Sequence, residues 1–250
     1  MSEMAATKTA KVALITGANK GIGLETARQL GALGITVLVG ARDLKKGETA
    51  AAELKREGID ARAIKLDVVD DGDRKAAASM IEKEFGRLDI LVNNAAINLD
   101  KKASLETSTT PSQTLRDTFD TNFFAVVELT QTLLPLIRKS KAGRIVNVSS
   151  AQGSLTLLAP KDSRIYATKT FSYDASKSAL NSFTLHLAHE LQGTPIKVNS
   201  IHPGWVRTVM GGQQAPLGLV EGAKTSVRLA TLPDDGPTGG YFHLNESLPW

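Results

Sequence analysis

The stretch Lys11-Val-Ala-Leu-Ile-Thr16-Gly17-Ala-Asn-Lys-Gly-Ile-Gly23 joins a short apolar run to a glycine-rich segment, and an amphipathic stretch at residues 24–33 follows it. A strand, a glycine turn and a helix in this order form the context that a dinucleotide-binding loop requires. Gly17 permits a sharp exit from the strand, Gly21 lets the backbone approach a pyrophosphate, and Gly23 allows close helix–sheet packing. The spacing Gly-x3-Gly-x-Gly differs from the general Gly-x-Gly-x2-Gly fingerprint, so a glycine turn without a nucleotide is the alternative.

Apolar runs alternate with amphipathic stretches along the rest of the chain. Strands that alternate with helices form a parallel sheet covered on both faces, so we predict an α/β fold, a single-domain doubly wound (Rossmann) sheet of about seven strands. The expected strands are residues 11–16, 35–40, 61–66, 89–93, 144–148, 197–201 and 240–243. The expected helices are residues 21–33, 44–56, 71–85, 111–138, 173–191 and 219–230.

The ends of these elements carry further signals. Gly34, Gly58 and Gly86 follow expected helices, where a left-handed cap is favoured. Residues 101–114 and 210–218 are expected to be surface loops that flank a site beyond the carboxyl ends of the strands. Residues 1–10 are expected to be a disordered leader, and residues 11–250 to form a single Rossmann-fold domain.

A tyrosine and a lysine lie four residues apart in Ser172-Tyr-Asp-Ala-Ser-Lys-Ser178, downstream of Val146-Asn-Val-Ser-Ser150. Residues at this spacing share one face of a helix, so the Lys177 ammonium can lie beside the Tyr173 phenol. A nearby cation lowers a tyrosine pKa that is ordinarily about 10. Tyr173 is therefore a candidate general acid/base, and Ser150 is available to hold a substrate oxygen. The alternative is an ordinary solvated i,i+4 pair.

Several further motifs follow in a fixed order, and with them the chain resembles the short-chain dehydrogenase/reductase family from about Lys11 to the C-terminus. The matching elements are Thr16–Gly23, Asp67-Val68, Asn93-Asn94-Ala95-Ala96, Asn122, Ser150, Tyr173 with Lys177, and Pro203-Gly204. Ala96 replaces the glycine that is usual in the family. The runs that resemble the carbonyl reductase branch are Thr121-Asn-Phe-Phe124, Leu133-Leu-Pro-Leu-Ile137, His202-Pro-Gly-Trp-Val-Arg-Thr208, Thr238-Gly-Gly240 and the terminal Trp250.

The resemblance implies an NADPH-dependent reductase that transfers hydride to the carbonyl of an aldehyde or ketone, with alcohol oxidation as the reverse reaction. It implies that Tyr173 donates the proton, Ser150 polarises the carbonyl, and Lys177 binds the nicotinamide ribose and lowers the tyrosine pKa. Asn122 is expected to hold a water through a kinked helix. The alternative for Asn122 is an exposed amide on the helix expected at residues 111–138.

The resemblance also implies a set of cofactor contacts. Asp67 and Val68 are expected to bracket the adenine, although Asp67 could instead cap the helix that begins near Asp71. The cofactor-binding residues that we expect are Gly17, Asn19, Lys20, Gly21, Ile22, Gly23, Arg42, Asp67, Val68, Asn94, Ala95, Ala96, Tyr173, Lys177, Pro203, Gly204, Val206 and Thr208.

The end of the second expected strand, Val39-Gly40-Ala41-Arg42-Asp43, bears on the form of the cofactor. Arg42 offers a planar fork that suits a 2′-phosphate, and Lys20 adds a second positive charge nearby. The resemblance implies NADP(H) for this combination, which we predict. Asp43 could instead bind an unphosphorylated ribose, and a solvated Arg42–Asp43 pair is a further alternative.

Composition narrows the classes of protein and of partner. The chain has 250 residues, is 42% hydrophobic, contains no cysteine and carries a formal charge of +4. Disulfides and thiolate metal sites are excluded, and no apolar run approaches the roughly 20 residues that a membrane span needs. Basic residues are mixed with acidic ones, which argues against nucleic-acid binding. We expect a cytoplasmic protein that binds a small-molecule carbonyl or alcohol and no metal.

The four histidines and a second tyrosine are alternative candidates for catalytic groups. His186, His189, His202 and His243 form no set of metal ligands with acidic partners. Ser150 lacks the Gly-x-Ser-x-Gly turn of a hydrolase. Tyr166 has a lysine at i+3 instead of i+4, so we reject it as the proton donor.

The chain is longer than most family members between Ser150 and Tyr173, and the additional length is residues 155–172. In the carbonyl reductase branch a larger insertion covers a helix surface otherwise used for oligomerisation. We therefore favour a monomer, with a passive surface loop as the alternative for this insertion. A second function of a different class is a catalytically silent NADP(H)-binding sensor of the same fold.

Overall fold

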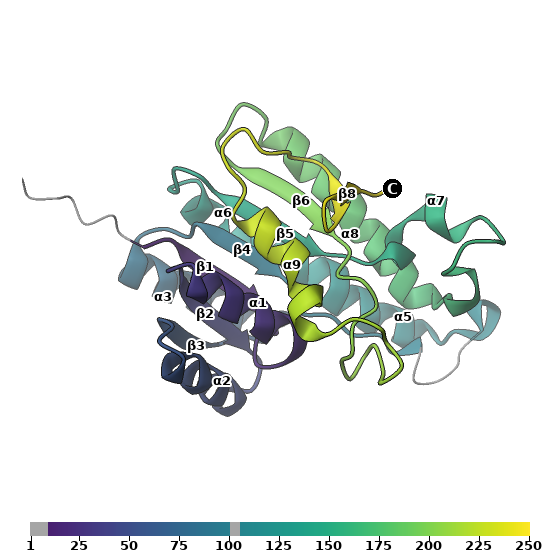
Figure 1. Cartoon of the computed structure of the whole chain (residues 1–250), viewed down its shortest axis with the longest axis horizontal. Helices are drawn as coiled ribbons and strands as arrows, with labels where there is room; N and C mark the ends of the chain where they lie inside the picture. The colour runs from purple at the N-terminus through teal and green to yellow at the C-terminus, as the bar shows by residue number, and fades with distance from the viewer. Residues whose placement is uncertain (1–9, 101–105) are drawn as a thin grey trace, which may run out of the picture.

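The computed structural model describes residues 10–100 and 106–250, and it contains one eight-stranded sheet in the order β3-β2-β1-β4-β5-β6-β7-β8 (Figure 1). The strands are β1 (Val12–Thr16), β2 (Thr36–Ala41), β3 (Ala61–Lys65), β4 (Ile90–Asn93), β5 (Arg144–Val148), β6 (Lys197–Ile201), β7 (Tyr241–His243) and β8 (Glu246–Ser247). Neighbouring strands are parallel except for β7 and β8. The predicted doubly wound α/β sheet is confirmed, with one antiparallel edge strand beyond the seven expected.

Helices cover both faces of this sheet. They are α1 (Gly21–Ala32), α2 (Leu44–Arg56), α3 (Asp71–Phe85), α5 (Ser112–Phe119), α6 (Ala125–Ile137), α7 (Leu155–Leu158), α8 (Phe171–Glu190) and α9 (Leu219–Ala230). The predicted leader lies outside the described residues except for Ala10, which is exposed and precedes β1. Residues 101–105 of the expected loop also lie outside them. No helix in the described part of the chain is both long enough and apolar enough to cross a membrane.

The two hydrophobic cores follow from the alternation of side chains along the buried strands. In β1, Ala13 and Ile15 belong to the core under α1, α2 and α9, whereas Val12 and Leu14 belong to the core under α3, α6 and α8. All five residues of β1 are buried, as expected for a central parallel strand. Gly34, Gly58 and Gly86 have φ values of 78°, 83° and 71°, which confirms the predicted left-handed helix ends.

The helix predicted at residues 111–138 is not continuous. A π-helical turn at Asp120–Phe124 separates α5 from α6. The Asn122 side chain in this turn exchanges two hydrogen bonds with the backbone of Ile97, each 2.9 Å long. Such π turns interrupt the regular helical hydrogen bonding and occur often at functional sites.

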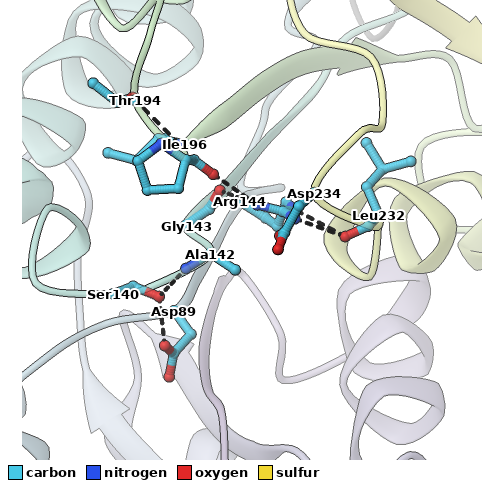
Figure 2. A network of polar contacts seen from close by, with 10 residues as sticks. Asp89, Ser140, Ala142, Gly143, Arg144, Thr194, Ile196, Leu232 and Asp234 are labelled. Carbon is cyan, nitrogen blue, oxygen red and sulfur yellow. Dashed lines mark hydrogen bonds and ion pairs between the residues drawn. The ribbon is translucent and has the colours of Figure 1, made fainter.

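A polar network connects the segments at the amino-terminal ends of the strands, on the side of the sheet opposite to the glycine turn (Figure 2). Arg144 is 1% exposed and donates to the carbonyl oxygens of Gly143, Pro195 and Leu232 and to the Asp234 carboxylate. These bonds join β5 to the chain before β6 and after α9. They leave the carboxyl ends of the strands free to carry the loops that form the site.

Candidate active site

Four predicted catalytic residues converge from different elements at the carboxyl end of the sheet. Ser150 follows β5, Tyr173 and Lys177 lie one turn apart on α8, and Asn122 lies in the π turn. All four side chains are buried, with exposed fractions of 8%, 8%, 2% and 0% respectively. The alternatives of a solvated tyrosine–lysine pair and of an exposed Asn122 amide are therefore both wrong.

The phenol of Tyr173 forms a side-chain hydrogen bond with Ser150. Burial raises the pKa of Tyr173 to about 12, and the bond to Ser150 and the charge of Asp174 act in opposite directions as smaller effects. The sequence predicted a lowered pKa for this phenol. The predicted lowering is wrong for the protein without its cofactor. Burial of the phenol disfavours its charged form more than the polar neighbours favour that form.

Lys177 explains why the expected cation effect is weak. Its Nζ donates a hydrogen bond of 2.8 Å to the carbonyl oxygen of Val148 and lies 5.5 Å from the centroid of the Tyr173 ring. Burial lowers the pKa of Lys177 to about 7. The amine therefore carries only a partial positive charge near neutral pH, and any added negative charge nearby would restore it.

Asn122 connects the site to the loop after β4. Its Nδ2 donates to the Ile97 carbonyl and, at 3.1 Å, to the Ser176 hydroxyl on α8. Ser176 in turn donates to the carbonyl of Tyr173 at 2.7 Å. The asparagine thus holds the catalytic helix and the β4 loop in a common arrangement.

Two groups that support this arrangement were missed by the sequence analysis. The Asp100 carboxylate accepts from the backbone N–H groups of Ser172 and Tyr173, at 2.5 Å and 3.4 Å. A Cβ on Gly153 would lie 2.8 Å from Lys177 Cβ, so only glycine allows the turn after Ser150 to approach α8 this closely. Neither residue carried a local signal, because each acts on a segment distant in the chain.

The glycine turn has the conformation expected of a phosphate-binding loop. Gly17 and Gly21 have φ values of 63° and 60°, and a Cβ on Gly23 would lie 2.5 Å from Asn94 Nδ2. Asn94 Nδ2 itself donates to the carbonyl of Thr16 at 2.7 Å. The glycine turn thus packs against Asn94 at the end of β4. The backbone of the turn can approach a ligand, because its glycines carry no side chains.

Ala96 is accommodated without strain. It has the usual negative φ, since Leu244 is the only described non-glycine residue with a positive one. The usual glycine is therefore not needed at this position for its left-handed conformation.

The residues that bear on the form of the cofactor lie at the ends of neighbouring strands. Lys20 and Arg42 are both exposed, after β1 and β2. The Asp43 carboxylate caps α2 by accepting from the Lys46 backbone N–H at 3.3 Å, and it pairs with the Lys46 ammonium at 3.5 Å. Asp43 is therefore engaged with its own helix and not with Arg42.

The remaining predicted cofactor residues also lie near the carboxyl ends of the strands. Asp67 is half-buried beside buried Val68, and the cap of α3 is Asp70, so the alternative of an Asp67 cap is wrong. A Cβ on Gly21 would be 3.8 Å from Thr208 Cγ2, which places the loop after β6 beside the glycine turn. The other predicted members of this set in these segments are Asn19, Ile22, Ala95, Pro203, Gly204 and Val206.

The insertion 155–172 is more structured than a passive loop. It contains α7 and a short 3-10 turn at Tyr166–Thr168. Leu155, Leu158, Phe171 and Ala175 line a hollow of about 410 Å³ between the insertion and α8. Leu155 therefore belongs to an apolar hollow beside α8.

The second tyrosine and two of the histidines lie outside the site. Tyr166 is exposed, and its ring contacts the Lys169 ammonium at 3.9 Å. His186 and His189 are exposed on α8. The described residues contain no group of three or more histidine, cysteine or acidic side chains that could hold a metal ion.

Fold and site together define an oxidoreductase of the Rossmann type. The family profile described as short chain dehydrogenase matches residues 11–216. Carbonyl reductase [NADPH] 1 of Sus scrofa is 33% identical over 278 residues, which cover 96% of this chain and 94% of that protein. Short-chain dehydrogenase anuI of Penicillium roqueforti is 39% identical over 230 residues and 89% of each chain.

Solved structures agree with the sequence relatives. The NADPH-bound carbonyl reductase from chicken fatty liver superposes with a TM-score of 0.84 at 26% identity, covering 96% of this chain and 99% of that one. The carbonyl reductase Sniffer of D. melanogaster gives a TM-score of 0.82 at 27% identity, covering 96% and 100%. This chain belongs to the short-chain dehydrogenase/reductase family, in its carbonyl reductase branch.

Proposed function

We propose that this protein is an NADPH-dependent reductase of aldehydes or ketones. The observation that carries the proposal is the enclosed set of Ser150, Tyr173 and Lys177 at the carboxyl end of β5, beside a glycine turn with the geometry of a phosphate-binding loop. The NADPH named for the relatives supports the same cofactor here.

In this mechanism, bound NADPH supplies the hydride that reduces the carbonyl carbon. Ser150 donates a hydrogen bond to the carbonyl oxygen and so favours the negative charge that develops there. Tyr173 gives its phenolic proton to the same oxygen, which completes the alcohol. Because burial keeps the pKa of Tyr173 at about 12, the phenol holds its proton at neutral pH until the developing oxyanion draws it away.

The predicted cofactor residues suggest how this chain would hold each part of the cofactor. The turn Gly17–Gly23 would hold the pyrophosphate at the N-terminus of α1. Arg42 and Lys20 would bind the 2′-phosphate, and Asp67 and Val68 the adenine. Asn94, Ala95 and Ala96 would line the adenosine, Lys177 would bind the nicotinamide ribose, and Pro203, Gly204, Val206 and Thr208 would line the nicotinamide end.

The test mixes the protein with NADPH and a panel of aliphatic and aromatic aldehydes and ketones, and measures the consumption of NADPH by its absorbance. Tyr173→Phe should abolish turnover and leave NADPH binding nearly unchanged. Tyr166→Phe is the matched control, because it removes an exposed phenol from the neighbouring segment, and it should behave as wild type.

The alternative is an NADP(H)-binding sensor without turnover. It would be favoured if NADPH bound tightly while no carbonyl in the panel was reduced and Tyr173→Phe matched wild type. The complete Ser150–Tyr173–Lys177 set argues against it, since a sensor needs no proton donor. The monomeric state and the cytoplasmic location remain predictions from the sequence.

A further inference from the structure

His202 occupies a position beside the site that the proposed mechanism does not use. His202 is a half-buried residue that follows β6 directly, and its ring lies 5.1 Å from the ring of His243 at the end of β7. Its Nδ1 accepts a hydrogen bond of 3.1 Å from the backbone N–H of Ala151, the residue after Ser150. The histidine therefore contacts the turn that carries the carbonyl-polarising serine.

The turn after Ser150 has backbone N–H groups that need acceptors, and His202 supplies one of them. Ser150 caps a short 3-10 turn at Ala151–Gly153, whose first N–H groups have no partner within the turn. The N–H of Gln152 donates to Ser150 Oγ at 3.3 Å, and that of Gly153 to the Ser150 carbonyl at 2.7 Å. The N–H of Ala151 is the remaining donor, and His202 from another strand satisfies it.

The contacts also define the protonation of the histidine pair. Because Ala151 N–H donates to Nδ1, the neutral His202 ring carries its proton on Nε2. The carbonyl of His202 lies 2.9 Å from His243 Nδ1, so His243 is the donor there. Burial, with a smaller effect of His243, lowers the pKa of His202 to about 3, so its Nδ1 stays an acceptor at neutral pH.

We propose that His202 is a positioning residue for Ser150, which it holds in place through the Ala151 amide. The role rests on the proposed reductase function. His202 touches neither reacting atom. Its ring fastens the start of the 3-10 turn to the end of β6, so that Ser150 Oγ stays in reach of both Tyr173 and a substrate oxygen. Misplacing a catalytic group by about 1 Å can cost about a hundredfold in rate.

The experiment compares His202→Leu with His202→Asn. Leucine fills a similar volume without an acceptor, whereas the asparagine Oδ1 can take the place of Nδ1. His202→Leu should lower kcat about tenfold to a hundredfold, with little change in NADPH affinity. His202→Asn should restore most of the loss. His189→Leu, which removes an exposed histidine, should have no effect.

A double-mutant cycle separates positioning from a general structural role. In a Ser150→Ala background, His202→Leu should lower kcat by less than about twofold, because the group through which it acts is gone. An equal fold loss in both backgrounds, or an unchanged kcat in His202→Leu, would overturn the proposal.

Two measurements test the contact between His202 and Ala151 without depending on reductase activity, and the first needs no variant. In the wild-type protein, 15N NMR of the imidazole should show His202 neutral with its proton on Nε2 through pH 5, and protonation near the ordinary pKa of about 6.5 would contradict it. If the wild type reduces no carbonyl, the proposed function fails by itself. Faster exchange of the Ala151 amide proton in His202→Leu but not in His202→Asn would still support the hold on the turn, and equal exchange would overturn it.

Discussion

The carboxylate of Asp100, in the segment after β4, accepts a hydrogen bond of 2.5 Å from the backbone N–H of Ser172 in the first turn of α8. The residue that should cap this helix, Thr170, makes no side-chain cap bond. Asp100 takes over this role from a distant part of the chain, and the N–H group that it accepts from lies one residue before Tyr173, the proposed proton donor. A negative charge at this end also complements the helix dipole.

Asp100→Ala should therefore destabilise the protein by about 1–2 kcal/mol, the usual cost of losing a helix cap. It should also lower kcat, because the first turn of α8 carries Tyr173. Urea unfolding and steady-state kinetics measure the two effects. Asp100→Asn keeps an acceptor and should lose less, and Asp162→Ala, which alters an exposed side chain of the insertion, should do neither. Equal stability of Asp100→Ala and wild type would show that the cap is dispensable.

The lowered pKa of Lys177 predicts a dependence of stability on pH. Burial takes this pKa from 10.5 to about 7. Between these values the unfolded chain binds more protons than the folded one, so the free energy of unfolding should rise with pH from 7 towards 10. The raised pKa of Tyr173 acts only above pH 10, where it reverses the slope.

Urea unfolding at pH 7.0 and pH 9.5 tests this sign. The free energy of unfolding of Lys177→Met should exceed that of wild type most at pH 7. This difference between the two proteins should shrink as pH rises. Lys169→Met is the control, since it removes an exposed lysine near the same helix. A parallel pH dependence of wild type and Lys177→Met would contradict the assignment.

If Arg42 binds the 2′-phosphate as proposed, Arg42→Ala should weaken NADPH binding about tenfold to a hundredfold, because it would remove a charge-assisted contact. NADH lacks that phosphate, so its affinity should barely change. Lys20→Ala should act in the same direction to a smaller extent, and added salt should weaken NADPH more than NADH. Titration of intrinsic fluorescence measures both cofactors. Equal weakening of the two would mean that Arg42 supports the loop and does not read the phosphate.

Arg144→Met should destabilise the fold by about 2–4 kcal/mol, because the buried Leu232 carbonyl would lose both of its Arg144 donors and the carbonyls of Gly143 and Pro195 would each lose one. Asp234→Asn should cost far less, since the Asp234 side chain is 81% exposed and water can replace the pair. Thermal unfolding of the two variants measures the contrast. A similar loss for both would assign the stability to the ion pair and not to the buried carbonyl bonds.

The sequence by itself determined the features that depend on neighbours in the chain. The glycine turn after β1, the left-handed helix ends and the shared helix face of Tyr173 and Lys177 follow from local backbone geometry. The alternation of strands and helices was sufficient for the doubly wound sheet, because it dictates where apolar side chains can be buried. The motif order then placed the chain in its family.

Only the tertiary structure decided the features that depend on burial and on distant partners. Asp100 lies 72 positions from Ser172, and His202 lies 51 positions from Ala151, so no local pattern connects them. The direction of the Tyr173 pKa shift was mispredicted for the same reason: proximity of a lysine can be read from spacing, whereas desolvation of both groups depends on what the whole fold packs around them.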